Sequence, residues 1–230
     1  MTWNHTEGEP EEDYGLQTLP VASKSDDSEP IKFDIDESSI SKEEAEELRA
    51  FLNDNLDIFS KNDADLGDTD LVTHDIDVGE AEPVKSPPHR LNPDTRAALE
   101  DHVNSMLDSG IIEEAAGSPW ASPVVLVRKP NGKDYRFCLD MRKVNKVTKK
   151  DSYALPRIDD TIDALHGSVY FSSLDLRSAF FQVRLGEESK HLTTFCTHIG
   201  SFSFIHMPYG LANATCTFQK LMEKVLRGIQ

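Results

Sequence analysis

The chain has 230 residues, of which 38% are hydrophobic, less than the ~45–50% typical of a globular chain, so part of it is predicted to remain unpacked. Its net charge of −17 is divided unevenly: residues 1–82 contain 25 acidic and 5 basic side chains, and residues 83–230 contain 16 acidic and 19 basic ones. The acidic charge of the whole chain argues against nucleic-acid binding, but the near-neutral charge of residues 83–230 does not. No apolar run approaches the ~20 residues of a membrane span, and no signal peptide opens the chain. The three cysteines lack the spacing of a zinc site.

The first 90 residues predict an arm and a connector. Residues 1–40 are rich in Glu, Asp, Ser and Pro, a composition typical of a disordered acidic arm. Residues 41–90 form an acidic connector in which Ser41 and Glu44 have the spacing of a capping box. They predict one short helix that begins after Ser41, followed by a strand-like VTHDIDV at 72–78.

The body, residues 91–230, alternates helices with local hairpins. Asn92, Pro93 and Gly110 frame a helix, and Asn131-Gly132 predicts a tight hairpin turn between two apolar strands. A short amphipathic helix is expected over 155–167, strands over 168–175 and 181–185, a second hairpin around residue 200, and a helix over 213–227. The predicted class is α+β.

Two acidic motifs are better explained by structure than by chemistry. Asp108-Ser109-Gly110 resembles an aspartic-protease triplet, but it ends a framed helix, and a protease requires the Asp on a loop opposite a second one. Asp159-Asp160 could hold a metal, yet both residues belong to the solvated face of a predicted helix.

Cations and one carboxylate are the stronger candidates. Arg128, Lys129, Lys133 and Arg136 surround the predicted hairpin turn; they either protect an edge hairpin by charge or bind phosphate, and composition favours protection. Asp175 lies in FSSLDLRSAFFQV, where a predicted strand gives way to a turn. It suits a magnesium–phosphate site and, equally, a cap of the turn.

Three long segments, in order, decide between these alternatives. They are SPWASPVVLVRKPNGKDYRFCLDMRKVN (118–145), YALPRIDDTIDALHGSVYFSSLDLRSAFFQVRL (153–185) and TTFCTHIGSFSFIHMPYGLANATCTFQKLMEKVL (193–226). Together they closely resemble the reverse transcriptase of Ty3/Gypsy-type LTR retrotransposons, a domain of the Pol polyprotein. The resemblance implies a right-hand polymerase that adds dNTPs to a primer 3′-OH on an RNA or DNA template, with two Mg²⁺ ions.

The resemblance also assigns roles to residues. Asp175 is implied to be the first metal-binding aspartate, with the backbone carbonyl of Leu176 in the same coordination shell. Phe180 is implied to lie under the sugar, as the gate that favours deoxynucleotides, and Tyr209 of MPYGL to line the nucleotide pocket. The two residues implied to hold the triphosphate from the fingertip are Lys129 and Arg136, and the further nucleic-acid-binding candidates are Arg128 and Lys133.

The resemblance divides the body into fingers, about 91–150 and 183–210, and a partial palm, about 151–182 and 211–230. The family's second metal motif, Tyr-x-Asp-Asp, does not occur in the 230 residues. We therefore expect an incomplete chain without the rest of the palm, the thumb, RNase H and integrase, inactive alone and with weak or absent Mg²⁺ binding. The alternative is a non-catalytic nucleic-acid-binding fragment or a degenerate element product. Family habit implies the cytoplasm or a virus-like particle.

Overall fold

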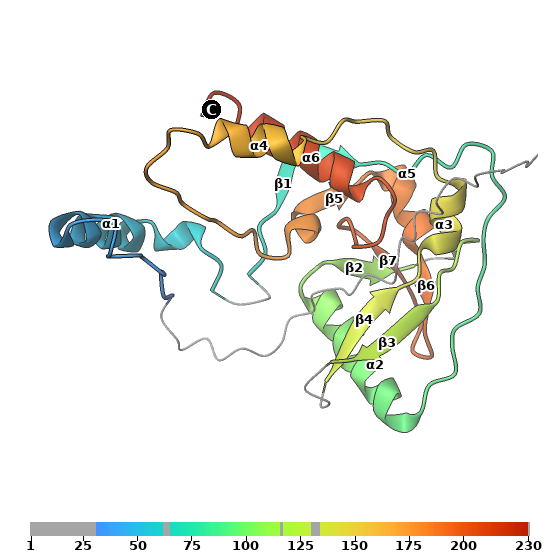
Figure 1. The fold of residues 1–230 in the computed structure, drawn as a ribbon. Helices are drawn as coiled ribbons and strands as arrows, with labels where there is room; N and C mark the ends of the chain where they lie inside the picture. The colour runs from blue at the N-terminus through green and yellow to red at the C-terminus, as the bar shows by residue number, and fades with distance from the viewer. Residues whose placement is uncertain (1–30, 62–64, 116, 130–133, 230) are drawn as a thin grey trace, which may run out of the picture.

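A computed structural model describes residues 31–61, 65–115, 117–129 and 134–229 (Figure 1). The predicted turn at Asn131-Gly132 and most of the predicted acidic arm lie outside these residues. The helices are α1 (Lys42–Asp54), α2 (Pro93–Asp108), α3 (Arg142–Val147), α4 (Ile158–Ala164), α5 (Glu187–Lys190) and α6 (Ala214–Val225). The strands are β1 (Thr69–His74), β2 (Ile112–Glu114), β3 (Val124–Arg128), β4 (Tyr135–Leu139), β5 (Val183–Leu185), β6 (Phe195–Cys196) and β7 (Ser201–Phe204). The predicted α+β class is confirmed.

The strands pair mostly with near neighbours in sequence. β3 and β4 form an antiparallel pair, and β6 and β7 form a second one that β2 extends on the other edge of β7. Both predicted pairs of hairpin strands are thus present. Two pairings join distant segments: β2 with β7, and β1, which runs parallel to β5, more than one hundred residues later in the chain.

The ends of α1 and α2 follow from their capping residues. At α1, the Ser41 hydroxyl accepts from the Glu44 amide and the Glu44 carboxylate accepts from the Ser41 amide, which is the predicted capping box. At α2, the Asn92 side chain accepts from the Thr95 amide at 2.9 Å. Asp108 is the last residue of this helix, and Gly110 follows with a φ of +67°, so the Asp-Ser-Gly triplet is a helix terminus.

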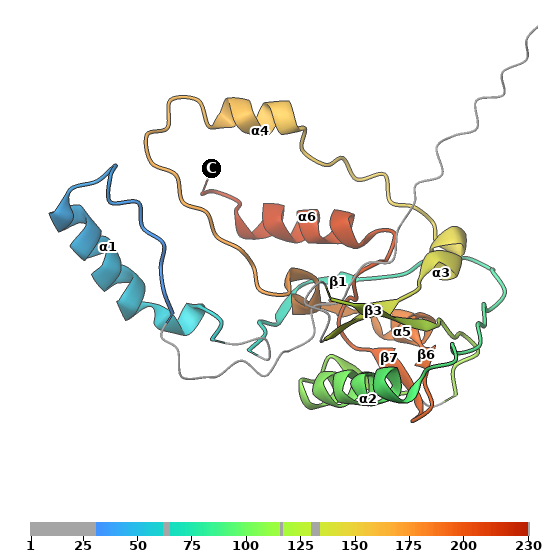
Figure 2. The same ribbon diagram turned by 60° about the horizontal axis from the view of Figure 1, so that its bottom comes forward.

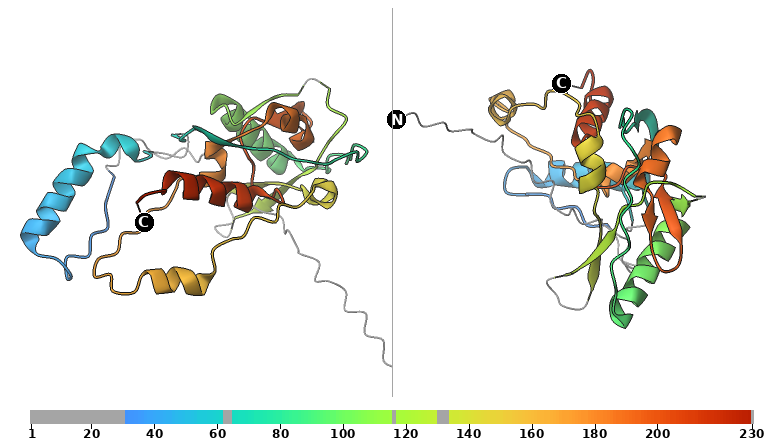
Figure 3. Two further views of the ribbon diagram at one scale, coloured as in Figure 1. Left: turned by 90° about the horizontal axis from the view of Figure 1, so that it is seen from above. Right: turned by 90° about the vertical axis from the view of Figure 1, so that its right-hand side faces the viewer.

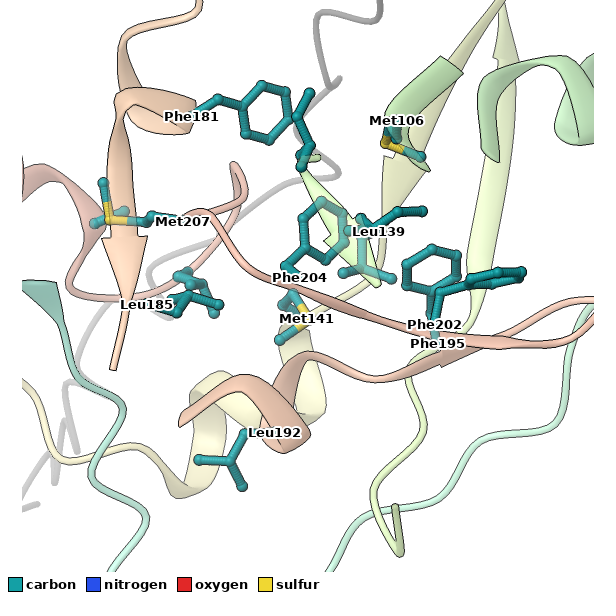
Figure 4. Close-up of a cluster of buried hydrophobic side chains, with 14 of the residues drawn as sticks. Met106, Leu139, Met141, Phe181, Leu185, Leu192, Phe195, Phe202, Phe204 and Met207 are labelled. Atoms are coloured by element: carbon teal, nitrogen blue, oxygen red, sulfur yellow. The ribbon is translucent and has the colours of Figure 1, made fainter. Parts of the chain in front are cut away.

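Aromatic side chains from several elements form the centre of the core (Figure 4). Phe137 of β4, Phe195 of β6 and Phe204 of β7 are each 0% exposed. The rings of Phe137 and Phe195 meet edge to face, with centroids 5.5 Å apart, and the Phe195 and Phe204 centroids are 5.6 Å apart. The two antiparallel sheets therefore share one core, which fixes the hairpins relative to each other.

The acidic connector takes part in this fold through β1. His74, its last residue, is 2% exposed, and its Nδ1 lies 2.8 Å from the Thr217 hydroxyl of α6. Burial, with a smaller contribution from the nearby Lys220 ammonium, lowers the pKa of His74 to about 4, so the ring is neutral at pH 7. The connector thus lies between β5 and α6 of the body.

The segment between α3 and β5 differs from the prediction. Residues 168–175 were predicted to form a strand, but none forms here and all eight residues are exposed. A strand needs a neighbour to satisfy its backbone groups, and no described strand lies beside this segment. Together with α4, the segment forms a loop outside α6 (Figure 2).

The predicted helix over 155–167 is present as α4, and Gly167 follows it with a φ of +84°. Its apolar side is not packed, since Ile158 is 77% exposed and Ile162 is 60% exposed. Across the described parts of the chain, no helix combines the length and the apolar character that crossing a membrane requires.

Candidate functional site

Asp175 lies at a sharp change in chain direction before β5. Ser178, three residues on, has a φ of +45° and a ψ of +46°, a left-handed conformation that is uncommon for a residue with a side chain. The turn is held by the Phe181 amide, which donates to the Ser178 carbonyl at 2.8 Å, and by the Gln182 side chain, which donates to the Arg177 carbonyl at 2.8 Å. Strained backbone of this kind is concentrated at functional sites.

Phe180 and Tyr209 form an aromatic pair beside this turn. Their ring centroids are 4.8 Å apart with an interplanar angle of 31°. The Phe218 ring of α6 also packs against the Phe180 ring, with centroids 5.6 Å apart. Tyr209, which is 29 residues further along the chain, is thereby fixed against the Asp175 turn.

The electrostatics of Tyr209 connect it to Asp175. Burial raises the pKa of the Tyr209 hydroxyl above its usual value, the hydrogen bond from the Phe180 amide lowers it, and the Asp175 carboxylate raises it again. The charge of Asp175 therefore acts on the Tyr209 ring. Three of the predicted site residues, Asp175, Phe180 and Tyr209, are brought together.

Few groups that could coordinate a metal ion lie around Asp175 in the described structure. Asp175 is exposed, and Leu176, 43% exposed, follows it in the turn. Among the described residues, no three His, Cys, Asp or Glu side chains gather in an arrangement that could hold a metal ion. A lone exposed carboxylate suits Mg²⁺ only when phosphate oxygens, water or further carboxylates complete the shell.

The predicted phosphate-binding cations lie on the β3–β4 pair. Arg128 stands opposite Tyr135, with its guanidinium 5.8 Å from the ring centroid, and Arg136 stands opposite Val127. The backbone amide of Lys129 donates to the Asp134 carbonyl at 2.8 Å. Arg128 and Arg136 are exposed, Lys129 is partly buried, and Lys133 lies outside the described residues. Within the described contacts, none joins these cations to Asp175.

Asn145 of α3 was missed by the sequence reasoning and holds the turn that carries Tyr209. Its side chain is 5% exposed; the amide nitrogen donates to the Gly210 carbonyl at 2.7 Å, and the amide oxygen accepts from the Ala212 backbone at 3.0 Å. A buried polar group must be paired, and these two bonds give the nitrogen and the oxygen each a partner in one turn. An Asn between Val144 and Val147 was the available signal.

Replacement of Asn145 by Ala should lower the free energy of unfolding by about 2–4 kcal/mol, because it leaves the Gly210 carbonyl and the Ala212 amide without partners. Asn145→Asp keeps the acceptor for Ala212 and should cost less when its carboxyl is protonated at low pH. Urea unfolding followed by circular dichroism measures both. A change below about 0.5 kcal/mol for Asn145→Ala would contradict the role assigned to this side chain.

A second polar link joins α6 to the chain after α3. The Asn213 amide nitrogen donates to the Lys149 carbonyl at 2.8 Å, and its oxygen accepts from the Asp151 amide at 3.0 Å. Lys220 forms an ion pair with Asp151. The residues on both sides of the Tyr209 turn are therefore tied to α3 or to the segment that follows it.

Comparison with known proteins gives a consistent result. Residues 127–230 match the family model described as reverse transcriptase (RNA-dependent DNA polymerase). The chain is 32% identical over 232 aligned residues to the retrovirus-related Pol polyprotein from transposon 297 of Drosophila melanogaster, which covers 96% of this chain and 22% of that protein. It is 47% identical over 91 residues to an RNA-directed DNA polymerase homolog of Oenothera berteroana, covering 40% of this chain and 64% of that one. The chain spans 14–22% of the first three Drosophila polyproteins.

The fold resembles that of a solved viral enzyme. A prototype foamy virus protease–reverse transcriptase superposes with a TM-score of 0.74 at 21% identity, covering 84% of this chain and 26% of the other. The foamy viral protease–reverse transcriptase in complex with an RNA/DNA hybrid gives a TM-score of 0.69 at 19% identity, covering 83% of this chain and 25% of the other. At these identities the likeness concerns the fold.

Proposed function

Residues 127–230 belong to the reverse transcriptase family, and the relatives of the chain are retrotransposon Pol polyproteins; on this premise, we propose that the chain provides the fingers and part of the palm of a Ty3/Gypsy-type RNA-directed DNA polymerase. Its substrates would be a template-primer duplex and dNTPs. The observation that carries the proposal is the grouping of Asp175, Phe180 and Tyr209 at a strained turn.

Asp175 would hold Mg²⁺, together with the Leu176 carbonyl and the phosphate oxygens of the incoming nucleotide. The metal would supply charge neutralisation at the reacting phosphate. Exposure of Asp175 supports this role, because an exposed carboxylate is accessible to a hydrated cation.

Phe180 would lie against the sugar of the nucleotide. Its ring is held between Tyr209 and Phe218, so it has little freedom to move aside for a 2′-hydroxyl. Tyr209 would form the adjoining wall of the pocket. Discrimination against ribonucleotides would therefore be steric.

Synthesis would also need carboxylates that the described part of the chain does not place beside Asp175. The sequence contains no Tyr-x-Asp-Asp. The exposed segment 168–175 has the composition of a strand, but no described strand lies beside it. A polypeptide segment that supplies both a strand and the acidic pair would satisfy the two needs together. Primer extension by the 230 residues, alone and joined to such a segment, tests the proposal. We expect product from the joined form only. Efficient synthesis by the 230 residues alone would show that Asp175 does not need carboxylates from another segment.

A second candidate function is nucleic-acid binding without synthesis, and the exposed Arg128 and Arg136 of the β3–β4 pair favour it. Changing Lys129, Lys133 and Arg136 to Ala should weaken duplex binding by about 10-fold or more at low salt and reduce the slope of log affinity against log salt by about 3. Filter binding measures both. The matched control removes three cations elsewhere, Lys42, Lys61 and Arg157; equal loss in the control would show that only total charge matters.

A further inference from the structure

A small pocket with a basic rim lies away from the Asp175 turn. It has a volume of about 130 Å³ and lies between the chain that enters α2, the first turns of that helix, and the tip of the β6–β7 hairpin. Its lining residues are Pro88, His89, Arg90, Leu91, Arg96, Leu99, Val124, Cys196, Thr197 and His198. A cavity of this size accommodates roughly one aromatic ring or one leucine side chain, since a dry engineered cavity of ~150 Å³ holds benzene.

The pocket has an apolar floor and a cationic rim. Leu99 and Val124 are buried beneath it, whereas Arg90 and Arg96 are exposed. None of its lining residues is acidic, although the nearby Glu100 carboxylate pairs with His198 at 2.7 Å. Within the described residues, no ion pair engages Arg90 or Arg96. The chemistry that fits is an apolar side chain flanked by carboxylates.

A peptide fits this lining better than a nucleic acid strand does. The lining contains no Phe, Tyr or Trp on which a base could stack. A phosphate group also gains nothing from an apolar floor, because it is strongly hydrated and is bound through charge and hydrogen bonds. An amphipathic acidic helix, in contrast, would bury an apolar anchor and place its carboxylates against the two guanidinium groups.

The chain itself carries such a helix. On α1, Leu48 is 40% exposed and Phe51 is 63% exposed. Helical geometry places Glu47 one turn before Phe51 and Asp54 almost one turn after it, and both carboxylates are exposed. The helix therefore presents to solvent an apolar pair framed by acids.

The helix and the pocket cannot meet within one molecule in this structure. α1 projects from one end, far from α2 and the β6–β7 hairpin at the other (Figures 1 and 3). We propose that the basic-rimmed pocket binds the α1 helix of a second copy of this chain, with Phe51 or Leu48 as the anchor and Arg90 and Arg96 against its carboxylates. Because the two surfaces differ, the contact is head-to-tail and can continue from copy to copy.

Sedimentation of the 230-residue chain tests this directly. We expect concentration-dependent association at low salt that weakens as salt is raised. Arg90→Glu with Arg96→Glu should weaken it by at least about tenfold. The matched control, Lys146→Glu with Arg157→Glu, makes the same change in net charge at exposed positions away from the pocket and should have little effect. A monomer at all concentrations, or equal effects of both pairs, would overturn the proposal.

A labelled peptide of residues 41–59 distinguishes the occupant. Its binding to the chain, followed by fluorescence anisotropy, should be lost with Leu48→Ser and Phe51→Ser in the peptide, and with the Arg90 and Arg96 reversals in the protein. Glu47→Lys with Asp54→Lys in the peptide should restore binding to the reversed protein. Displacement of the peptide by an oligonucleotide, with no such restoration, would assign the pocket to nucleic acid and contradict the proposal.

Discussion

Replacement of Asp175 by Asn should reduce primer extension by about a thousandfold in a polypeptide that joins these residues to a Tyr-x-Asp-Asp segment. The substitution keeps the size of the side chain and removes its charge, so the turn at Ser178 is preserved while the attraction for Mg²⁺ is lost. Single-turnover extension of a labelled primer, with dNTP in excess, measures the chemical step.

The matched control for this experiment is Asp159→Asn. Asp159 is also exposed, with 82% of its side chain accessible, and lies on α4. It should retain the activity of the unchanged polypeptide. If Asp175→Asn kept more than about a tenth of that activity, Asp175 would not hold the catalytic metal.

Replacement of Phe204 by Ala should lower the free energy of unfolding by about 3–5 kcal/mol. Phe204 is 0% exposed and contacts both Phe181, with centroids 6.3 Å apart, and Phe195, at 5.6 Å. It therefore joins the β6–β7 hairpin to the element that follows the Asp175 turn. Domains of this size are stable by only about 5–15 kcal/mol, so the loss is a large share of the total.

Urea unfolding at 25 °C measures this change, with Phe171→Ala as the control. Phe171 is 65% exposed in the outer loop, so its truncation should change the free energy of unfolding by less than about 0.5 kcal/mol. Equal effects of the two substitutions would mean that the core is not centred on Phe204.

Local signals predicted the elements whose ends are fixed by nearby residues. Ser41 with Glu44, and Asn92 with Pro93, mark helix starts within a few positions, and the structure has the caps they predict. The hairpin strands around Gly200 were predictable for the same reason, since both strands and their turn lie within about ten residues. Element type follows from sequence where the stabilising contacts are local.

The secondary-structure predictions failed where an element depends on contacts with segments distant in sequence. Residues 168–175 have the composition of a strand, but strand formation depends on a neighbour, and the described chain offers none there. The short helix α3 was missed because its stability comes largely from tertiary contacts, among them the bonds of Asn145 to a turn 65 residues away. The local sequence shows neither whether 168–175 has a neighbouring strand nor which turn Asn145 contacts.

The candidate site was predictable in part. The resemblance named Asp175, Phe180 and Tyr209, and the structure brings these three together. It also named Lys129 and Arg136, which lie on the β3–β4 pair and have no described contact with the other three. The proposed link between the β3–β4 cations and the Asp175 turn is a bound nucleotide, so no direct side-chain contact is required. Their joint role in nucleotide binding stays a prediction.

Paramagnetic broadening tests whether Asp175, Phe180 and Tyr209 form a metal–nucleotide site, and it is best measured in the polypeptide that joins these residues to a Tyr-x-Asp-Asp segment. Mn²⁺ and a dNTP are added to the ¹⁵N-labelled protein, and the same titration is repeated with Asp175→Asn. The acidic N-terminal part should be broadened equally in both. We expect additional broadening of the backbone signals of residues 174–182 and 209–212 that disappears in the variant; identical broadening in both proteins would mean that Asp175 does not hold the metal.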